Sequence, residues 1–373
     1  MTTMDKTAAG KGGYPHFMLK EIMEQPEVLR RTFAKGLASV EQGQLAPEYR
    51  SLELAKYHKV LIVACGTAYH AGLVGKHFIE KLARLPVSVE LAAEFRYTDS
   101  FVDHETLVIV ISQSGETGDT LAALREAKQK GGRIIAITNV EGSTIGREAH
   151  DVINTVAGVE VAVASTKAYM AQLATLYLLG LQLALDQEKI NTGEAVDYLK
   201  ALEQVPGQVE QVLEQSGVVK AWAERLAQSD HAFFLGRGLD AAVAMEGSLK
   251  FKETTYIHGE AYSAGEFRHG PIALIDEGVP AVVLATQPKL VTYTTALVEE
   301  LRARGAWVMG VLGKEAEETA GRYHNQMMLP EILPEFSPML SVVPLQLLAY
   351  YTACARGTDV DCPRHLVKSV KDA

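Results

Sequence analysis

The feature that most constrains the fold of this 373-residue chain is an internal repeat. Lys59–Gly72 has an apolar run, a glycine turn and a helix start, and His231–Gly247 has the same order. Three more segments are matched in the same order roughly 170 residues later: Ala92–Thr98 by Ala264–Gly270, Thr106–Gly115 by Val279–Pro288, and Leu124–Asn139 by Val298–Gly313. Four matches in one order indicate a duplication, so two halves with the same fold are expected.

Each half alternates short β-branched runs with amphipathic helices, which is typical of α/β proteins with parallel sheets. The fold class predicted is α/β, with two duplicated flavodoxin-like αβα sandwiches. The boundaries expected are a helical leader at 1–45, domains at 46–186 and 231–356, a helical connector at 187–230 and an active-site tail at 357–373. The clearest helix of the leader is predicted over His16–Ala34.

Composition excludes several classes of protein. A formal net charge of −10 argues against a nucleic-acid surface, which needs clustered Lys and Arg. The three cysteines form no CxxC motif, and the start of the chain has no apolar signal-peptide core, so a cytoplasmic protein is expected. The apolar stretch Ala168–Asp186 is interrupted by Gln172 and Gln182, so we expect a buried core or interface helix and no membrane segment.

Residues 111–120 read "ISQSGETGDT" and place several hydroxyl groups where a strand meets a helix. A helix start offers unpaired N–H groups and a positive dipole end, which together suit an anion. Ser112, Ser114 and Thr117 add hydroxyl donors, and Gly115 lets the backbone approach a ligand. The alternative is that Ser114 or Thr117 only caps the helix. The second half has "ATQP" at this place, which favours a phosphate site in the first half.

Two further turns are notable, one before the apolar helix and one at the end of a predicted strand. In "VAVASTKAY" (161–169), Ser165 and Thr166 are either simple helix caps or ligand contacts. In "ACGTAYHAG" (64–72), Cys65 has no recognisable basic partner, so it is interpreted as a core residue and not as a nucleophile.

Three ionisable residues share one face of a predicted helix. Glu246, Lys250 and Glu253 are spaced i, i+4 and i+7, whereas Lys252 falls on nearly the opposite face. One interpretation is a solvated salt-bridge ladder. The other is a cleft in which a carboxylate beside a lysine acts as a general base.

The loop after this helix and the end of the chain also carry candidate site residues. His258 and His269 flank two glutamates, but without HxH or HExxH spacing no metal site is predicted. A histidine on such a glycine-flanked loop is more often a proton shuttle or a hydrogen-bonded fixture. The tail "GTDVDCPRHLVKSVKDA" is unusually specific, and Pro363, Arg364 and Lys368 suggest that it folds over something.

The motifs "ACGTAYHAG", "SQSGET", "VASTKAY", "LKFKE", "GEFRHGPIALI" and "GTDVDCPRHLVKSV" together resemble the isomerase half of the glutamine:fructose-6-phosphate amidotransferases, the glucosamine-6-phosphate synthases. That half is built from two sugar isomerase (SIS) domains. The resemblance runs from about Lys11 to the last residues.

The resemblance implies an enzyme that converts fructose 6-phosphate and ammonia into glucosamine 6-phosphate, without a metal or organic cofactor. It also implies a homodimer whose active sites are shared. Thr67, Ser112, Gln113, Ser114 and Thr117 would bind the phosphosugar and its phosphate, and Val163 and Ser165 would line the sugar. Glu253 would move a proton between C1 and C2, with Lys250 assisting at the sugar oxygens. His269 from a neighbouring subunit would open the ring, and Lys368 would form an imine with the keto sugar.

Two departures from the family pattern are visible. Ala68 stands where the family often has serine, and residue 2 is threonine where the family's glutaminase half begins with a catalytic cysteine. The expectation is an excised domain or a free-standing enzyme that uses ammonia directly. A glucosamine-6-phosphate deaminase or a related deglycase is the alternative, because the same residues serve both directions. A non-catalytic phosphosugar sensor is a third reading, which the retained acid–base set and the acidic charge disfavour.

Overall fold

The computed structural model describes residues 10–370. Residues 1–9, on which the signal-peptide and Thr2 arguments depend, and residues 371–373 lie outside the described part. The chain divides into two compact units. The β3–β7 unit comprises Glu27–Glu160, Lys167–Gln204 and 367–370, and the β8–β12 unit comprises 10–26, Val161–Thr166 and Val205–Leu366. Each unit therefore contains segments that are distant in sequence.

The β3–β7 unit is built on a five-stranded parallel sheet in the order β4-β3-β5-β6-β7. Its strands are β3 (Lys59–Ala64), β4 (Val87–Leu91), β5 (Thr106–Ser112), β6 (Arg133–Thr138) and β7 (Asp151–Asn154). The central strands are almost entirely buried, as expected of a parallel sheet covered on both faces. Ser112 pairs in register with Thr138, so the loops after β5 and β6 begin at the same edge.

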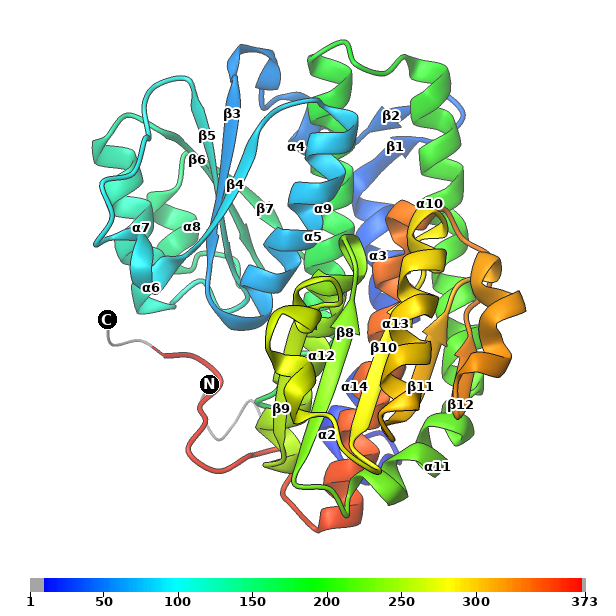
Figure 1. Cartoon of the computed structure of the whole chain (residues 1–373). Coiled ribbons are helices and arrows are strands. Elements are labelled where there is room, and N and C mark those ends of the chain that lie inside the picture. The colour runs from blue at the N-terminus through cyan, green and yellow to red at the C-terminus, as the bar shows by residue number, and fades with distance from the viewer. Residues whose placement is uncertain (1–9, 371–373) are drawn as a thin grey trace. The chain divides into compact units, whose positions relative to one another are not determined.

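Helices cover both faces of this sheet (Figure 1). One face carries α5 (Gly66–Leu82) and α9 (Lys167–Asp186), which pack against each other. The other carries α6 (Ala92–Phe95), α7 (Gly118–Gln129) and α8 (Thr144–Glu148). The unit also contains α3 (Gln25–Gly36), β1 (Leu37–Ser39), β2 (Gln44–Leu45), α4 (Pro47–Arg50) and the short helix η1 (Leu54–Lys56).

The β8–β12 unit repeats this plan. Its strands are β8 (His231–Gly236), β9 (His258–Ser263), β10 (Pro280–Ala285), β11 (Trp307–Leu312) and β12 (Asn325–Met328). They are parallel in the order β12-β11-β10-β8-β9, which matches the first sheet strand for strand. The predicted duplication and the α/β fold class are thus confirmed.

The helices of this unit also follow the first. On one face α12 (Leu239–Thr255) packs against α14 (Ser337–Arg356), which also contacts α11 (Ser216–Leu226). On the other face α13 (Val291–Ala303) packs with the 3-10 segment η5 (Lys314–Arg322). The remaining elements are α2 (Phe17–Met23), η2 (Glu266–His269), η3 (Pro271–Leu274), η4 (Pro288–Leu290) and η6 (Pro334–Phe336). Helix α10 (Thr192–Glu214) leads from one unit to the other.

The prediction of one leader helix over His16–Ala34 is wrong. The structure has two helices, α2 and α3, with Glu24 between them. Pro26 explains the break, because proline lacks an N–H donor and is accepted in the first turn of a helix but not in its interior. The boundary between the units follows Pro26, so α2 and the part of α3 from Glu27 onward belong to different units.

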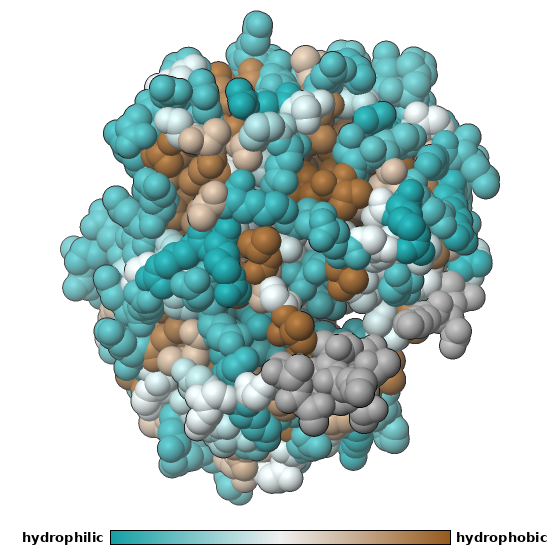
Figure 2. Space-filling model, turned by 180° about the vertical axis from the view of Figure 1, so that it is seen from behind, coloured by the Kyte–Doolittle hydropathy of each residue, from teal (hydrophilic) through white to brown (hydrophobic). Residues whose placement is uncertain are grey.

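The apolar helix α9 is a core element of its unit, as the sequence predicts. By length and composition both α9 and Pro334–Arg356 could cross a membrane, but 94% and 83% of their apolar windows are buried inside the protein. The face of the molecule in Figure 2 is mostly hydrophilic, and its hydrophobic side chains form separate groups. Burial in a protein core accounts for the apolar character of both helices.

Candidate functional site

The loop between β5 and α7, residues 113–117, is shaped by its own hydroxyl groups. The hydroxyls of Ser112 and Thr117 lie 2.9 Å apart, and the Ser112 Oγ also accepts the Gly115 N–H at 3.1 Å. The Ser114 Oγ accepts the Glu116 N–H at 3.2 Å. Thr117 occupies the N-cap position of α7 but makes no side-chain capping bond, so the capping interpretation fails for this residue. The loop thus places three hydroxyl groups at a helix N-terminus, where the positive end of the helix dipole favours an anion.

Neighbouring segments fix the position of this loop. Gly115 has a φ of +65°, and a Cβ there would lie 2.1 Å from the Ser143 Oγ. The Gln113 carbonyl accepts the Asn139 N–H at 3.1 Å. Thr67 is the second residue of α5, which follows β3, and β3 pairs directly with β5. Thr67 therefore belongs to the same edge of the sheet as the loop.

The C-terminal tail contacts this loop within the same unit. The Ser369 hydroxyl lies 3.0 Å from the Ser114 hydroxyl, and the Val370 carbonyl accepts the Gly118 N–H at 3.1 Å. The tail thus folds over the candidate phosphate site. Lys368 directly precedes Ser369, so its backbone lies next to that site.

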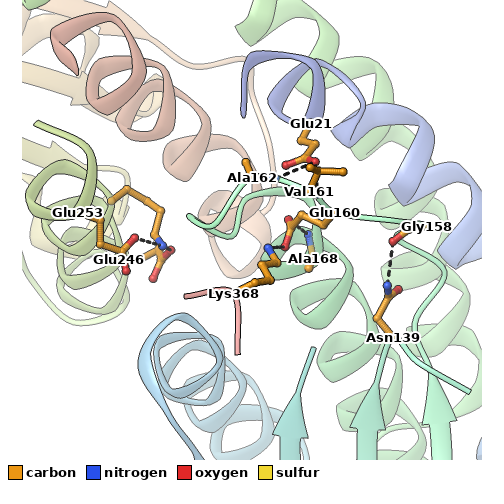
Figure 3. Close-up of polar contacts among 11 residues, drawn as sticks. Glu21, Asn139, Gly158, Glu160, Val161, Ala162, Ala168, Glu246, Glu253 and Lys368 are labelled. Atoms are coloured by element: carbon orange, nitrogen blue, oxygen red, sulfur yellow. Dashed lines mark hydrogen bonds and ion pairs between the residues drawn. The ribbon is translucent and has the colours of Figure 1, made fainter. Parts of the chain in front are cut away.

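Lys368 is paired with a buried carboxylate that the sequence analysis missed. Its Nζ lies 2.5 Å from the Glu160 Oε2, and the two side chains are 18% and 0% exposed. The Glu160 Oε1 accepts the Ala168 N–H at 3.0 Å in the first turn of α9. Figure 3 shows Lys368 pointing toward Glu160, with Ala168 on the other side of the carboxylate. No local pattern indicates this pair, because its members are 208 residues apart.

The three ionisable residues of α12 form a cluster inside the β8–β12 unit. The Lys250 Nζ lies 2.6 Å from the Glu253 Oε2 and 3.7 Å from the Glu246 Oε1. Lys250 is 1% exposed and Glu246 0%, whereas Glu253 is 21% exposed. Lys252 is exposed, as expected from its position on the face of the helix opposite these three residues. Burial rules out the solvated ladder and leaves Glu253 as the member that solvent or a ligand can reach.

The loop Val161–Thr166, which carries Val163 and Ser165, also belongs to the β8–β12 unit. Glu21 of α2 accepts the Val161 and Ala162 N–H groups at 2.5 and 3.3 Å (Figure 3). The Val163 N–H donates to the Asp361 carbonyl at 3.0 Å. Val163 and Ser165 are half-buried, so both remain partly accessible. The leader helix and the start of the tail therefore hold this loop in place.

Asp361 joins the leader to the tail. Its carboxylate accepts the Phe17 and Met18 N–H groups, at 3.0 and 2.8 Å, at the start of α2. Further along, the Arg364 N–H donates to the Tyr256 hydroxyl at 2.8 Å, and the Arg364 guanidinium lies over the Tyr256 ring. The tail up to Leu366 is thus anchored in the β8–β12 unit.

The remaining candidates lie as follows. His269 is exposed at the end of η2, and His258 is exposed 3.2 Å from the Glu260 carboxylate. No group of three or more His, Cys, Asp or Glu that could hold a metal occurs among residues 10–370. Burial raises the pKa of the Cys65 thiol, which fits a core residue better than a nucleophile.

The predicted residues therefore fall into two groups. The β3–β7 unit holds Thr67, Ser112, Gln113, Ser114, Thr117 and Lys368. The β8–β12 unit holds Val163, Ser165, Lys250, Glu253 and His269. One group offers anion-binding hydroxyls with a lysine, and the other offers a carboxylate beside a buried lysine.

Comparison with known proteins identifies the family to which this architecture belongs. The profile of the SIS domain matches residues 53–182 and 225–356, which together make up more than half of the chain. The chain belongs to the SIS domain family. Its two SIS domains coincide with the two sheets and their covering helices.

Over nearly its whole length the chain is also similar to isomerizing aminotransferases. It is 50% identical to a glutamine–fructose-6-phosphate aminotransferase (isomerizing) of Clostridium tetani, over 99% of this chain and 61% of that protein. The chain thus spans about three fifths of the length of the curated relatives it matches.

Two solved structures extend this comparison. The C-terminal domain of glucosamine-fructose-6-phosphate aminotransferase from Francisella tularensis is 38% identical, with a TM-score of 0.91, covering 95% of this chain and all of that one. A glucosamine-6-phosphate deaminase from Thermotoga maritima is 25% identical, with a TM-score of 0.74, covering 95% and 99%. The predicted resemblance to the isomerase half of the amidotransferases is confirmed.

Proposed function

We propose that this chain interconverts fructose 6-phosphate plus ammonia and glucosamine 6-phosphate, as an aldose–ketose isomerase that aminates its substrate. The observation that carries the proposal is the similarity, at 50% identity over 99% of the chain, to a protein named as an isomerizing aminotransferase. The site supports it with hydroxyls at a helix N-terminus for the phosphate and a carboxylate beside a buried lysine for proton transfer.

Each residue or group of residues has a separate role in this reaction. Ser112, Gln113, Ser114, Thr117 and Thr67 hold the phosphosugar, and Val163 and Ser165 line it. Lys368 forms an imine at the C2 carbonyl, and ammonia then replaces the lysine amine at C2, which releases Lys368. The resulting C2 imine makes the C1 protons more acidic. Glu253 moves a proton between C1 and C2, and Lys250 assists at the sugar oxygens as charge develops there. During ring opening His269 protonates the ring oxygen, and the anomeric hydroxyl loses its proton as the C2 carbonyl forms. This chemistry uses no metal and no organic cofactor.

The experiment that tests the proposal is product formation from fructose 6-phosphate, with ammonium chloride varied and glutamine as the alternative nitrogen donor. Glucosamine 6-phosphate is the expected product with ammonium. The Glu253→Gln variant is expected to lose about 100-fold or more in turnover while still binding the phosphosugar, because only the base is removed. Turnover retained by that variant would overturn the role of Glu253.

A second candidate has a specific observation in its favour. The chain is similar to a structure named as a glucosamine-6-phosphate deaminase. This similarity supports the reverse reaction, release of ammonia from glucosamine 6-phosphate, as the candidate function. The same residues would catalyse it, so direction is decided by assay. Ammonia release that greatly exceeds amination at matched substrate concentrations would favour the deaminase.

We further propose that the protein is a cytoplasmic homodimer that binds neither nucleic acid nor membrane. The exposed position of His269 supports a residue that serves the site of a second copy. The acidic net charge of −10 supports the absence of a nucleic-acid partner. A monomer with full activity in size-exclusion chromatography would contradict the shared site.

A further inference from the structure

We propose that Glu160 is the acid–base partner that converts Lys368 into a nucleophile and then carries the protons of imine formation. This inference rests on the proposed function, in which Lys368 attacks the C2 carbonyl of the sugar. It assigns a chemical role to a carboxylate that no sequence motif indicates.

The first argument is geometric. The Glu160 Oε2 and the Lys368 Nζ are 2.5 Å apart, which is a direct hydrogen bond along which a proton can pass. The second carboxylate oxygen, Oε1, is engaged by the Ala168 N–H at 3.0 Å. That bond orients the carboxylate so that its other oxygen faces the lysine.

The second argument is placement. Glu160 is fully buried, and a buried charge is retained only where a partner or a function compensates for its desolvation. A pair whose task was only to fasten the tail would work as well at the surface, and the tail already has anchors in Ser369 and Val370. The Lys368 side chain is 18% exposed and the Glu160 side chain is 0% exposed, so of the two only the lysine side chain is open to solvent or a ligand.

The third argument is the rigidity of the segment that carries Glu160. Asn139, at the end of β6, donates from its Nδ2 to the Gly158 carbonyl at 2.8 Å (Figure 3). Its Oδ1 accepts the Thr155 hydroxyl at 2.9 Å and the Ala157 N–H at 3.0 Å. Because the Asn139 N–H also donates to the Gln113 carbonyl, one residue links the phosphate loop to the segment before Glu160. A phosphosugar held by the loop would therefore meet a fixed Lys368–Glu160 pair.

The step balances as follows. The ammonium of Lys368 gives a proton to Glu160, which leaves a neutral amine and a neutral carboxylic acid. The amine forms the N–C2 bond while the carbonyl π electrons move to oxygen, and Glu160 returns its proton to that oxygen. Glu160 then takes one proton from the nitrogen and delivers it to the hydroxyl, which leaves as water. The products are a protonated imine, a water molecule and the Glu160 carboxylate, with the net charge of the pair unchanged.

The test uses borohydride, which reduces an imine to a stable secondary amine detectable on Lys368 by mass spectrometry. The full chain is mixed rapidly with fructose 6-phosphate, and the rate of adduct formation is measured. Glu160→Gln keeps the size and a hydrogen-bonding oxygen but cannot exchange the proton, so the rate is expected to fall about 100-fold. Glu148→Gln, which neutralises a carboxylate in the exposed pair with Arg125, is the matched control and should keep the wild-type rate.

A second measurement separates proton transfer from a merely structural role. Sorbitol 6-phosphate carries the phosphate but no carbonyl, so its affinity reports binding alone. The affinity is expected to be unchanged in Glu160→Gln, and added formate is expected to restore part of the adduct rate in Glu160→Ala by supplying a carboxylate. Wild-type adduct rates in Glu160→Gln would overturn the proposal. Parallel loss of sorbitol 6-phosphate binding, or no rescue by formate in a variant that binds it, would also overturn the proposal.

The failure of this inference is distinguishable from failure of the proposed function. If the wild-type protein itself gives no adduct on Lys368 and no amino sugar, the proposed function is wrong. If the wild-type protein gives both and Glu160→Gln behaves identically, only the role of Glu160 is wrong.

Discussion

Thr67 and Asp240 hold equivalent places in the two halves of the chain, since each is the second residue of the helix that follows the first strand of its sheet. Thr67 is a candidate ligand of the phosphosugar. The Asp240 carboxylate instead accepts the Thr286 N–H at 2.9 Å and the Thr286 hydroxyl, just after the end of β10. That place corresponds to the hydroxyl loop after β5, so an internal anion occupies the equivalent edge of the second sheet.

Asp240 should make stability depend on pH. Complete burial raises its pKa to about 6 from 3.8, despite the bonds from Thr286. Because the folded-state pKa is above the unfolded value, the stability that Asp240 contributes is fully present below about pH 4 and is lost as the pH rises through 6. The loss is about 3 kcal/mol between these limits. Urea unfolding at several pH values should show wild type losing stability relative to Asp240→Asn as pH rises.

The control for this prediction is Asp276→Asn, an exposed aspartate of the same unit, which should track the wild-type pH profile. Parallel profiles for wild type and Asp240→Asn would mean that the carboxyl titrates alike in the folded and unfolded chains.

Gly115 is needed both for its backbone angle and for the space it leaves. A Cβ there would lie 2.1 Å from the Ser143 Oγ and 2.8 Å from the Thr138 Oγ1. Gly142 has a similar φ of +70° with nothing within 4 Å, so Gly142→Ala measures the backbone cost alone. That cost is about 1–2 kcal/mol. Gly115→Ala is expected to lose about 1–3 kcal/mol more because the added methyl group overpacks the loop. Equal losses in urea unfolding would show that the loop relaxes around the methyl group.

Lys250 is a buried cation between two carboxylates, and its removal leaves them uncompensated. Lys250→Met should therefore lower the free energy of unfolding by about 3–5 kcal/mol. The exposed Lys252→Met on the same helix should change it by less than about 0.5 kcal/mol. The double variant Glu246→Gln with Lys250→Met should recover part of the loss, because one unpaired charge is gone. A double variant less stable than Lys250→Met would contradict this electrostatic account.

At the scale of elements, the duplication extends to how helices pack. A Cβ on Gly75 of α5 would lie 3.1 Å from Leu176 of α9. In the other half, a Cβ on Gly247 of α12 would lie 2.4 Å from Leu345 of α14. In both units a glycine of the helix that follows the first-numbered sheet strand, β3 or β8, leaves room for a leucine of the long helix packed against it. The repeat recognised from the strands and turns therefore also governs these helix crossings, which the sequence analysis did not pair.

This packing can be tested with a double-mutant cycle. Gly247→Ala should cost about 1–3 kcal/mol by overpacking, and Leu345→Ala about 2–5 kcal/mol by leaving a cavity. The combined variant should cost less than the sum, because the new methyl group enters the space that the leucine vacates. Chemical denaturation of the four proteins gives the coupling energy. Strict additivity would mean that the two residues do not share this contact.

At the scale of the whole molecule, the features that could be predicted are those set by short stretches of sequence. Apolar runs, glycine turns and their repetition predicted the strands, the parallel sheets and the hydroxyl loop after β5. The Glu160–Lys368 pair was not predicted, because its members are 208 residues apart and neither lies in a periodic spacing pattern. It was also not predicted that each unit is assembled from segments distant in sequence, and the reason is related. Residues 10–26 and Val161–Thr166 join the β8–β12 unit through long-range bonds such as those of Glu21, which no local periodicity reports.

The proposed homodimer predicts complementation between two inactive variants. Glu253→Gln lacks the base and His269→Ala lacks the ring-opening histidine, so each should be nearly inactive alone. If His269 serves the neighbouring copy's site, a mixed dimer has one site with both residues and one with neither. Unfolding and refolding an equal mixture should then restore about one quarter of wild-type activity, since half of the dimers are mixed and each has one intact site of two. Activity equal to the sum of the separate variants would instead mean that each chain builds its site alone, and His269→Ala refolded with wild type is the control for losses during refolding.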